Sequence, residues 1–178
     1  MIEIPRRALV VIVGASGSGK SSFAARNFLP TEVVSSDRLR AAISDDEADQ
    51  SVSAQAFELL YLIVRRRLEA GRTAVVDATS TTPEARAALT AVARDCDAPA
   101  FAIVLDLPPE VCLHNDALRA GRSVGPSVVA AQTEALARSL PGIAAEGFER
   151  VWVLRSEVEV RGAGVRRAAA PVPQPPPL

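Results

Sequence analysis

Short and almost uninterrupted apolar runs alternate along this chain with longer segments of helical character. Apolar runs without alternating polar residues are typical of strands that are buried on both faces, as in parallel sheets. The alternation predicts an α/β fold, with a central parallel sheet of about five strands and helices on both faces. The apolar runs lie at 8–13, 32–34, 73–77, 100–106 and 151–154. The helical segments lie at about 20–28, 51–70, from 82 onward, 108–119 and 127–140.

The end of the chain differs from the rest in composition. After Gly162 come two arginines, three alanines and a run dominated by proline, which cannot build a core. We therefore expect one domain at 1–160 and a disordered Ala/Pro-rich tail or linker at 161–178. The break between two helical segments, which contains Gly121 and Gly125, predicts a lid at about 113–130.

Composition narrows the class of protein only slightly. The 178 residues are 48% hydrophobic and 23% charged, with a formal net charge of −1. This balance argues against a surface that coats duplex nucleic acid, which needs a basic excess. Cys96 and Cys112 form no disulfide framework and have no metal-ligand spacing. No signal peptide or membrane-length apolar segment is visible, so we expect a cytoplasmic protein without a membrane partner.

The strongest chemical signal follows the first long apolar run. Gly14 to Ser21 fits the pattern G-x-x-x-x-G-K-[ST] and stands between a predicted strand and a predicted helix. Glycines let backbone N–H groups point at phosphates, and the helix adds the positive end of its dipole. Lys20 would place its charge between the β- and γ-phosphates, and the Ser21 hydroxyl would bind Mg²⁺. The predicted nucleotide-binding residues are Gly14, Ala15, Ser16, Gly17, Ser18, Gly19, Lys20, Ser21 and Ser22, with ATP or another NTP as ligand.

Two aspartates stand where strands are predicted to end. In an open parallel sheet, catalytic groups lie just beyond the carboxyl ends of strands. Asp37 would orient an acceptor hydroxyl and take its proton, although capping of a following helix is the alternative. Asp77 would contribute to Mg²⁺ binding through water. A guanine-specificity motif is absent, and Ala78 rather than a glutamate follows Asp77, so a kinase is favoured over a GTPase or a motor ATPase.

Arg119 and Arg122 flank a break in the helical pattern. Small P-loop kinases cover the nucleotide with a mobile segment whose arginines neutralise the transferring phosphoryl group. We expect both arginines to bind the phosphates, with Arg122 in the catalytic set beside Lys20 and Asp37.

From about Leu9 to Leu154 the chain resembles the kinase domain of the bacterial polynucleotide 5′-kinase/3′-phosphatase of the RNA-repair system. The most distinctive match is the acidic string from Ser44 to Ser51. The other matching segments are 14–22, 31–37, Arg40, 75–79, 83–86, 125–126, 138–140 and 146–148.

The resemblance implies an ATP- and Mg²⁺-dependent kinase that phosphorylates the 5′-OH ends of single-stranded RNA or DNA. By it, Asp37 is the general base, Arg122 is a lid arginine, and Arg40 lies near the acceptor's phosphodiester backbone. The implied acceptor-side residues are Asp37, Arg40, Asp77, Thr79 and Arg86. It also implies phosphatase and ligase partners, which would attach through the tail.

Three departures from the family pattern stand near the predicted site. Asn115-Asp116 replaces an Arg-Asn pair on the lid, so one phosphate-binding arginine is missing. Ser80 replaces an asparagine after Asp-Ala-Thr, and Ala120-Gly121 replaces Pro-Asp between the lid arginines. These changes leave open a kinase of the same fold that acts on a small alcohol, and an ATP-binding module with little chemistry. A homodimer is also possible, although no residue specifies one.

Overall fold

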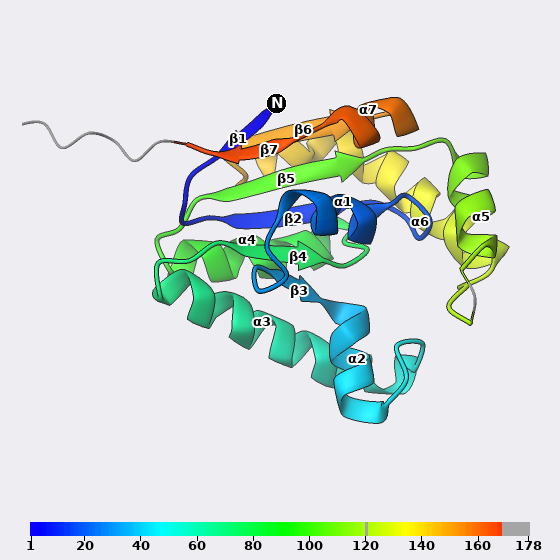
Figure 1. Cartoon of the computed structure of the whole chain (residues 1–178), viewed down its shortest axis with the longest axis horizontal. Helices are drawn as coiled ribbons and strands as arrows, with labels where there is room; N and C mark the ends of the chain where they lie inside the picture. The colour runs from blue at the N-terminus through cyan, green and yellow to red at the C-terminus, as the bar shows by residue number, and fades with distance from the viewer. Residues whose placement is uncertain (120, 169–178) are drawn as a thin grey trace, which may run out of the picture.

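A computed structural model of the chain describes residues 1–119 and 121–168. Five parallel strands form the central sheet in the order β3-β4-β2-β5-β6 (Figure 1). This confirms the predicted α/β fold, which is that of a P-loop kinase. The strands are β2 Leu9–Val13, β3 Val33–Ser35, β4 Ala74–Asp77, β5 Ala100–Leu105 and β6 Arg150–Leu154.

Helices cover both faces of this sheet. In sequence order they are α1 Lys20–Asn27, α2 Ser36–Ser44, α3 Ser53–Glu69, α4 Pro83–Asp95, α5 Pro109–Ala117, α6 Pro126–Ser139 and α7 Glu157–Gly162. Two 3₁₀ helices, η1 Gln50–Val52 and η2 Leu140–Ala145, stand before α3 and after α6. At α4, the side chain of Thr82 accepts from the backbone N–H of Ala85 and so caps the helix.

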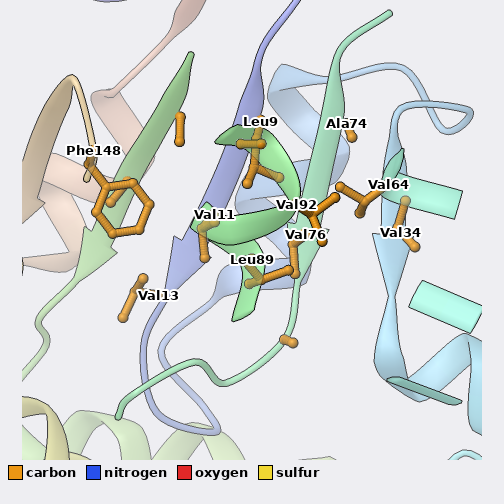
Figure 2. Close-up of a cluster of buried hydrophobic side chains, with 14 of the residues drawn as sticks. Leu9, Val11, Val13, Val34, Val64, Ala74, Val76, Leu89, Val92 and Phe148 are labelled. Atoms are coloured by element: carbon orange, nitrogen blue, oxygen red, sulfur yellow. The ribbon is translucent and has the colours of Figure 1, made fainter. Parts of the chain in front are cut away.

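Strand β2 shows why the two faces have separate cores. Leu9, Val11 and Val13 point toward α3 and α4, where they pack with Val64 and Leu89 (Figure 2). Val10 and Ile12 point the other way and join the cluster that contains Phe23 of α1 and Val160 of α7. Successive side chains along a strand point to opposite faces of the sheet. A strand in which every residue is apolar therefore contributes to both cores.

The chain end is ordered further than composition predicts. Residues 165–167 form β7, which pairs in parallel with β1, Ile2–Ile4, and α7 reaches Gly162. The expected start of the tail at residue 161 is therefore wrong, because β1 offers backbone partners to a segment with no apolar pattern of its own. Residues 169–178 of the predicted tail lie outside the described residues.

No helix in the described part of the chain is both long and apolar enough to cross a membrane.

Candidate active site

The loop between β2 and α1 contains left-handed backbone conformations at two of its glycines. Gly17 and Gly19 have φ angles of 78° and 90°, in the left-handed region that favours glycine. A Cβ on Gly17 would lie 2.0 Å from the carbonyl oxygen of Cys112, so α5 packs directly against the loop. We call residues 14–19 the P-loop below.

Lys20 begins α1 and folds back over the P-loop. Its Nζ donates to the carbonyl oxygens of Gly14 at 2.9 Å and Ala15 at 2.8 Å. Burial lowers the pKa of Lys20, and the nearby carboxylates of Asp77 and Asp37 oppose that shift. The side chain thus lies beneath the P-loop and close to both aspartates.

The start of α1 offers unused polar groups. Gly19 caps the helix and has no side chain to accept from its first amides. The Ser18 hydroxyl is buried and has no hydrogen-bond partner within the described residues. Together with the helix dipole and Lys20, these groups fit an anionic ligand such as a phosphate chain.

A cleft of about 200 Å³ opens beside the P-loop, between α1, α2 and the ends of β3 and β4. It brings together residues from four separate stretches of the chain. Asp77 ends β4 directly opposite Ser35 of β3 and is buried. The polar residues that line the cleft are Ser21, Ser35, Asp37, Arg38, Glu47, Asp77 and Arg122.

Asp37 lies in the first turn of α2, where two arginines contact it. Arg40 Nη2 lies 2.5 Å from Asp37 Oδ1, and Arg119 Nη2 lies 3.5 Å from Oδ2. Arg40 is buried and also donates from Nε to the carbonyl oxygen of Glu47 at 2.8 Å. Arg40 therefore joins α2 to residues 44–51, which we call the acidic segment, while Asp37 lines the cleft.

Both predicted lid arginines reach across toward the cleft. We call residues 118–119 and 121–125, between α5 and α6, the lid segment. Arg119 Nη1 donates to the Ser16 hydroxyl at 2.7 Å, and Arg122 Nη1 donates to Glu47 Oε2 at 2.7 Å. Arg119 thus contacts the P-loop and Asp37, whereas Arg122 contacts the acidic segment.

Helices α5 and α6 hold the tip of the P-loop through contacts that the sequence did not predict. Asn115 Nδ2 donates to the Gly17 carbonyl oxygen at 3.0 Å, and the Ser16 hydroxyl donates to Asp116 Oδ1 at 2.7 Å. Gln132 Oε1 of α6 accepts from the backbone N–H of Ser16 at 2.7 Å. A departure from the family pattern pointed to Asn115 and Asp116, but no sequence signal marks Gln132.

Arg86 is not at the cleft, contrary to the expectation from the resemblance. It is fully buried, and its guanidinium donates to both carboxylate oxygens of Glu146 at 2.6 Å. Arg86 Nη1 also donates to the Ser80 carbonyl oxygen at 3.0 Å. Its bonds are directed into the protein, and the structure does not bring Arg86 together with the residues of the cleft.

Two further predicted residues have positions that the sequence left open. Thr79 contributes its carbonyl oxygen, which accepts from the Gly14 N–H at 3.2 Å and joins the loop after β4 to the P-loop. Ser22 is exposed on the first turn of α1 and does not line the cleft. Arg38 and Glu47 do line it, although neither was in the predicted set.

Comparison with known proteins places this geometry in context. A family model described as an AAA domain matches residues 9–142. Among curated proteins, none matches the sequence of this chain.

Several solved structures have the same fold. A chain of the Pnkp1/Rnl/Hen1 RNA repair complex is 20% identical, with a TM-score of 0.66, over 78% of this chain and 47% of that one. The present chain thus spans about half of that relative. Chaetomium thermophilum Kti12, in complex with ADP-AlF3, is 17% identical, with a TM-score of 0.60, over 86% and 93% of the two chains. A chain of the PezAT toxin-antitoxin system of Streptococcus pneumoniae is 15% identical, with a TM-score of 0.58, over 86% and 69%.

Proposed function

This chain belongs to the AAA domain family, and from that premise we propose that it is an ATP- and Mg²⁺-dependent kinase for the 5′-hydroxyl ends of RNA or DNA. One observation carries the proposal. Ser21, Asp37 and Asp77 line a single cleft, and the half-buried Lys20 lies close to both aspartates. A phosphate donor on the P-loop and a hydroxyl acceptor at Asp37 would therefore meet in this cleft.

The P-loop is suited to hold the phosphates of ATP. The amides at the start of α1, which no side chain caps, and the Lys20 ammonium supply donors and positive charge for the phosphates. Transferring a phosphoryl group requires mainly positioning and stabilisation of charge, which these groups provide.

Ser21 and Asp77 fit a magnesium ion. Both present oxygen atoms to the cleft, and oxygen is the ligand that Mg²⁺ takes in proteins. Ser21 and Asp77 would hold this ion, which would neutralise charge on the donor phosphates.

Asp37 is the general base in this proposal. Its carboxylate takes the proton of the acceptor hydroxyl as the hydroxyl oxygen bonds to the γ-phosphorus and ADP leaves with the electrons of the broken bond. Arg40 holds one carboxylate oxygen, and Arg119 approaches the other from the P-loop side. Arg119 and Arg122 are placed to neutralise charge that develops on the transferring group.

Arginines at the cleft support a polynucleotide end as the acceptor, although the carboxylates of Asp37, Glu47 and Asp77 line it as well. Arg38 and Arg122 line it, and Arg40 lies directly behind Asp37. A 5′-terminal nucleotide carries a phosphodiester close to its hydroxyl, which such arginines would bind. Likeness in fold to a chain of an RNA repair complex is consistent with a nucleic-acid substrate and with repair partners.

The test is ADP release with Mg²⁺-ATP, with and without a short single-stranded 5′-OH RNA, in wild type and in Asp37→Ala. We expect release to require the RNA and to fall about 10²- to 10⁴-fold in the variant, while ATP binding changes little. Asp95→Ala, which removes an exposed carboxylate on α4, is the matched control and should leave both unchanged. Near-normal transfer by Asp37→Ala would rule out the assigned base.

The dimensions of the cleft favour a second acceptor class, a small alcohol. The volume is about 200 Å³, and the Arg122–Glu47 pair brings the lid segment against the acidic segment beside it. Labelled phosphate transfer to the RNA, with unlabelled 5′-OH oligonucleotide as competitor, separates the two classes. ATP binding without RNA-dependent ADP release would favour the small alcohol or a binding module.

A further inference from the structure

Asp116 is a buried carboxylate that contacts two parts of the site at once. Its side chain is almost fully buried on the last turn of α5. Oδ1 accepts from the Ser16 hydroxyl of the P-loop at 2.7 Å. Oδ2 accepts from the Ser123 hydroxyl at 2.7 Å and from the backbone N–H groups of Val124 and Gly125 at 3.0 and 3.3 Å. One oxygen thus binds the P-loop and the other binds the lid segment.

These donors compensate for the cost of burying a charge. Burial raises the pKa of Asp116, but hydrogen bonds from Ser16, Ser123, Gly125 and Val124 outweigh burial and lower it. A carboxylate with this many donors has one favoured geometry, because displacing it would weaken several buried hydrogen bonds at once. The contact therefore fixes the lid segment relative to the P-loop.

The same hydroxyl connects Asp116 to Arg119. Ser16 Oγ donates to Asp116 and accepts from Arg119 Nη1 at 2.7 Å, and Arg119 also lies 3.8 Å from Asp116 Oδ1. Arg119 then reaches Asp37 with its other nitrogen. A displacement of the P-loop tip would be passed through Ser16 and Asp116 to the arginine that faces the general base.

We infer that Asp116 is a positioning residue that couples the P-loop to the lid segment and so places Arg119 between donor and acceptor. The inference rests on the proposed function and deepens it. It also gives a role to the departure at Asn115-Asp116, where the family resemblance implies a lost arginine. In this chain Asn115 binds the Gly17 carbonyl and Asp116 binds the Ser16 hydroxyl, so the pair holds the P-loop against α5.

The test compares Asp116→Ala with wild type in two measurements. We expect kcat to fall about 10- to 100-fold, while the Kd for ATP changes less than about threefold, because the arginine is misplaced but the P-loop remains. Asp116→Asn keeps one acceptor oxygen and should give an intermediate kcat. Glu134→Gln, on the exposed face of α6, is the control and should match wild type.

Hydrogen exchange at residues 121–125 supplies the second measurement. In wild type, ATP should slow exchange in this segment at least about threefold, and in Asp116→Ala it should have no effect. This comparison needs no acceptor, so it tests the coupling even if transfer to RNA is not found. If Asp116→Ala does not fold, Ser123→Ala removes one donor and should lower kcat about two- to fivefold in its place.

Three outcomes would overturn the inference. One is a kcat in Asp116→Ala that equals the kcat of wild type, when wild type does transfer phosphate to the RNA. This outcome leaves the proposed function standing. Another is an equal loss of kcat and ATP binding, which indicates only a structural role. The third is ATP protection of the lid segment in Asp116→Ala as large as in wild type.

Discussion

The two sides of the cleft are held in different ways. On the donor side, the P-loop is bound by buried or half-buried hydrogen bonds from α5, α6 and the loop after β4. On the acceptor side, Asp37 and Glu47 are held mainly by ion pairs with arginines, and the Arg122 side chain in one of these is 53% exposed. Carboxylates on the donor side are therefore shielded from water, whereas those on the acceptor side are partly exposed to it.

The difference has a physical consequence. Breaking buried, hydrogen-bonded charges costs several kcal/mol, whereas exposed ion pairs contribute about 0–1 kcal/mol. The donor side can thus keep one geometry for a constant ligand, the phosphate chain. The exposed Arg122–Glu47 pair of the acceptor side can be exchanged for contacts with an incoming substrate at little cost, whereas the pair of Asp37 with the buried Arg40 is more costly to break.

The largest effect on stability is expected at Arg86, which donates to the Ser80 carbonyl oxygen in the loop after β4. Arg86→Ala leaves Glu146 without its partner and the Ser80 carbonyl without a donor. We expect the free energy of unfolding to fall by about 3–5 kcal/mol, measured by urea denaturation. Arg65→Ala, at the exposed pair with Asp95, should cost less than about 1 kcal/mol. Equal losses in the two variants would remove the contrast between buried and exposed pairs.

Gly17→Ala tests the close packing of α5 on the P-loop. The new Cβ would meet the Cys112 carbonyl oxygen at 2.0 Å, in a backbone of φ 78°. We expect a loss of about 2–4 kcal/mol in the free energy of unfolding and a large loss of ATP affinity. The control is Gly71→Ala, with φ 72° and open space around it, which should cost about 1 kcal/mol and leave ATP binding unchanged. Isothermal calorimetry and urea denaturation separate the two effects.

Arg122→Ala tests how readily the acceptor side gives up an ion pair. Because the Arg122–Glu47 pair is exposed, its loss should change the free energy of unfolding by less than about 1 kcal/mol. Transfer should nevertheless fall about tenfold or more, since the arginine is assigned to the transferring phosphoryl group. Glu47→Gln, with the arginine retained, should reduce transfer much less. A stability loss above about 2 kcal/mol in Arg122→Ala would show that this side is as rigid as the other.

The donor side could be predicted from the sequence because its chemistry is local. The P-loop pattern and the flanking strand and helix lie within a single stretch, Leu9 to Asn27, and the structure has them at the predicted places. The five-stranded sheet was predicted for the same reason, since each strand is a continuous apolar run.

Contacts between distant segments could not be predicted in this way. Gln132 meets Ser16 across 116 positions of sequence, and Arg86 meets Glu146 across 60. The family resemblance suggested substrate contact for Arg86, whereas the fold buries this side chain against Glu146. The pairing of β1 with β7 was missed because short strands with exposed positions carry no apolar run.

A pH-dependent effect is expected at Cys112, whose carbonyl oxygen faces Gly17 of the P-loop on the donor side. Burial raises the pKa of its thiol to about 11, with Lys20 opposing that shift. From pH 9 to 11 the folded protein therefore keeps a proton that the unfolded chain loses, so the contribution of this thiol to stability falls as pH rises through that window. Urea denaturation at pH 8 to 11 should show a gentler decline in Cys112→Ala than in wild type. Because other groups titrate in the same range, the difference between the two curves is the measured quantity. Parallel curves would mean that water reaches the thiol and that the donor side is more open than its hydrogen bonds indicate.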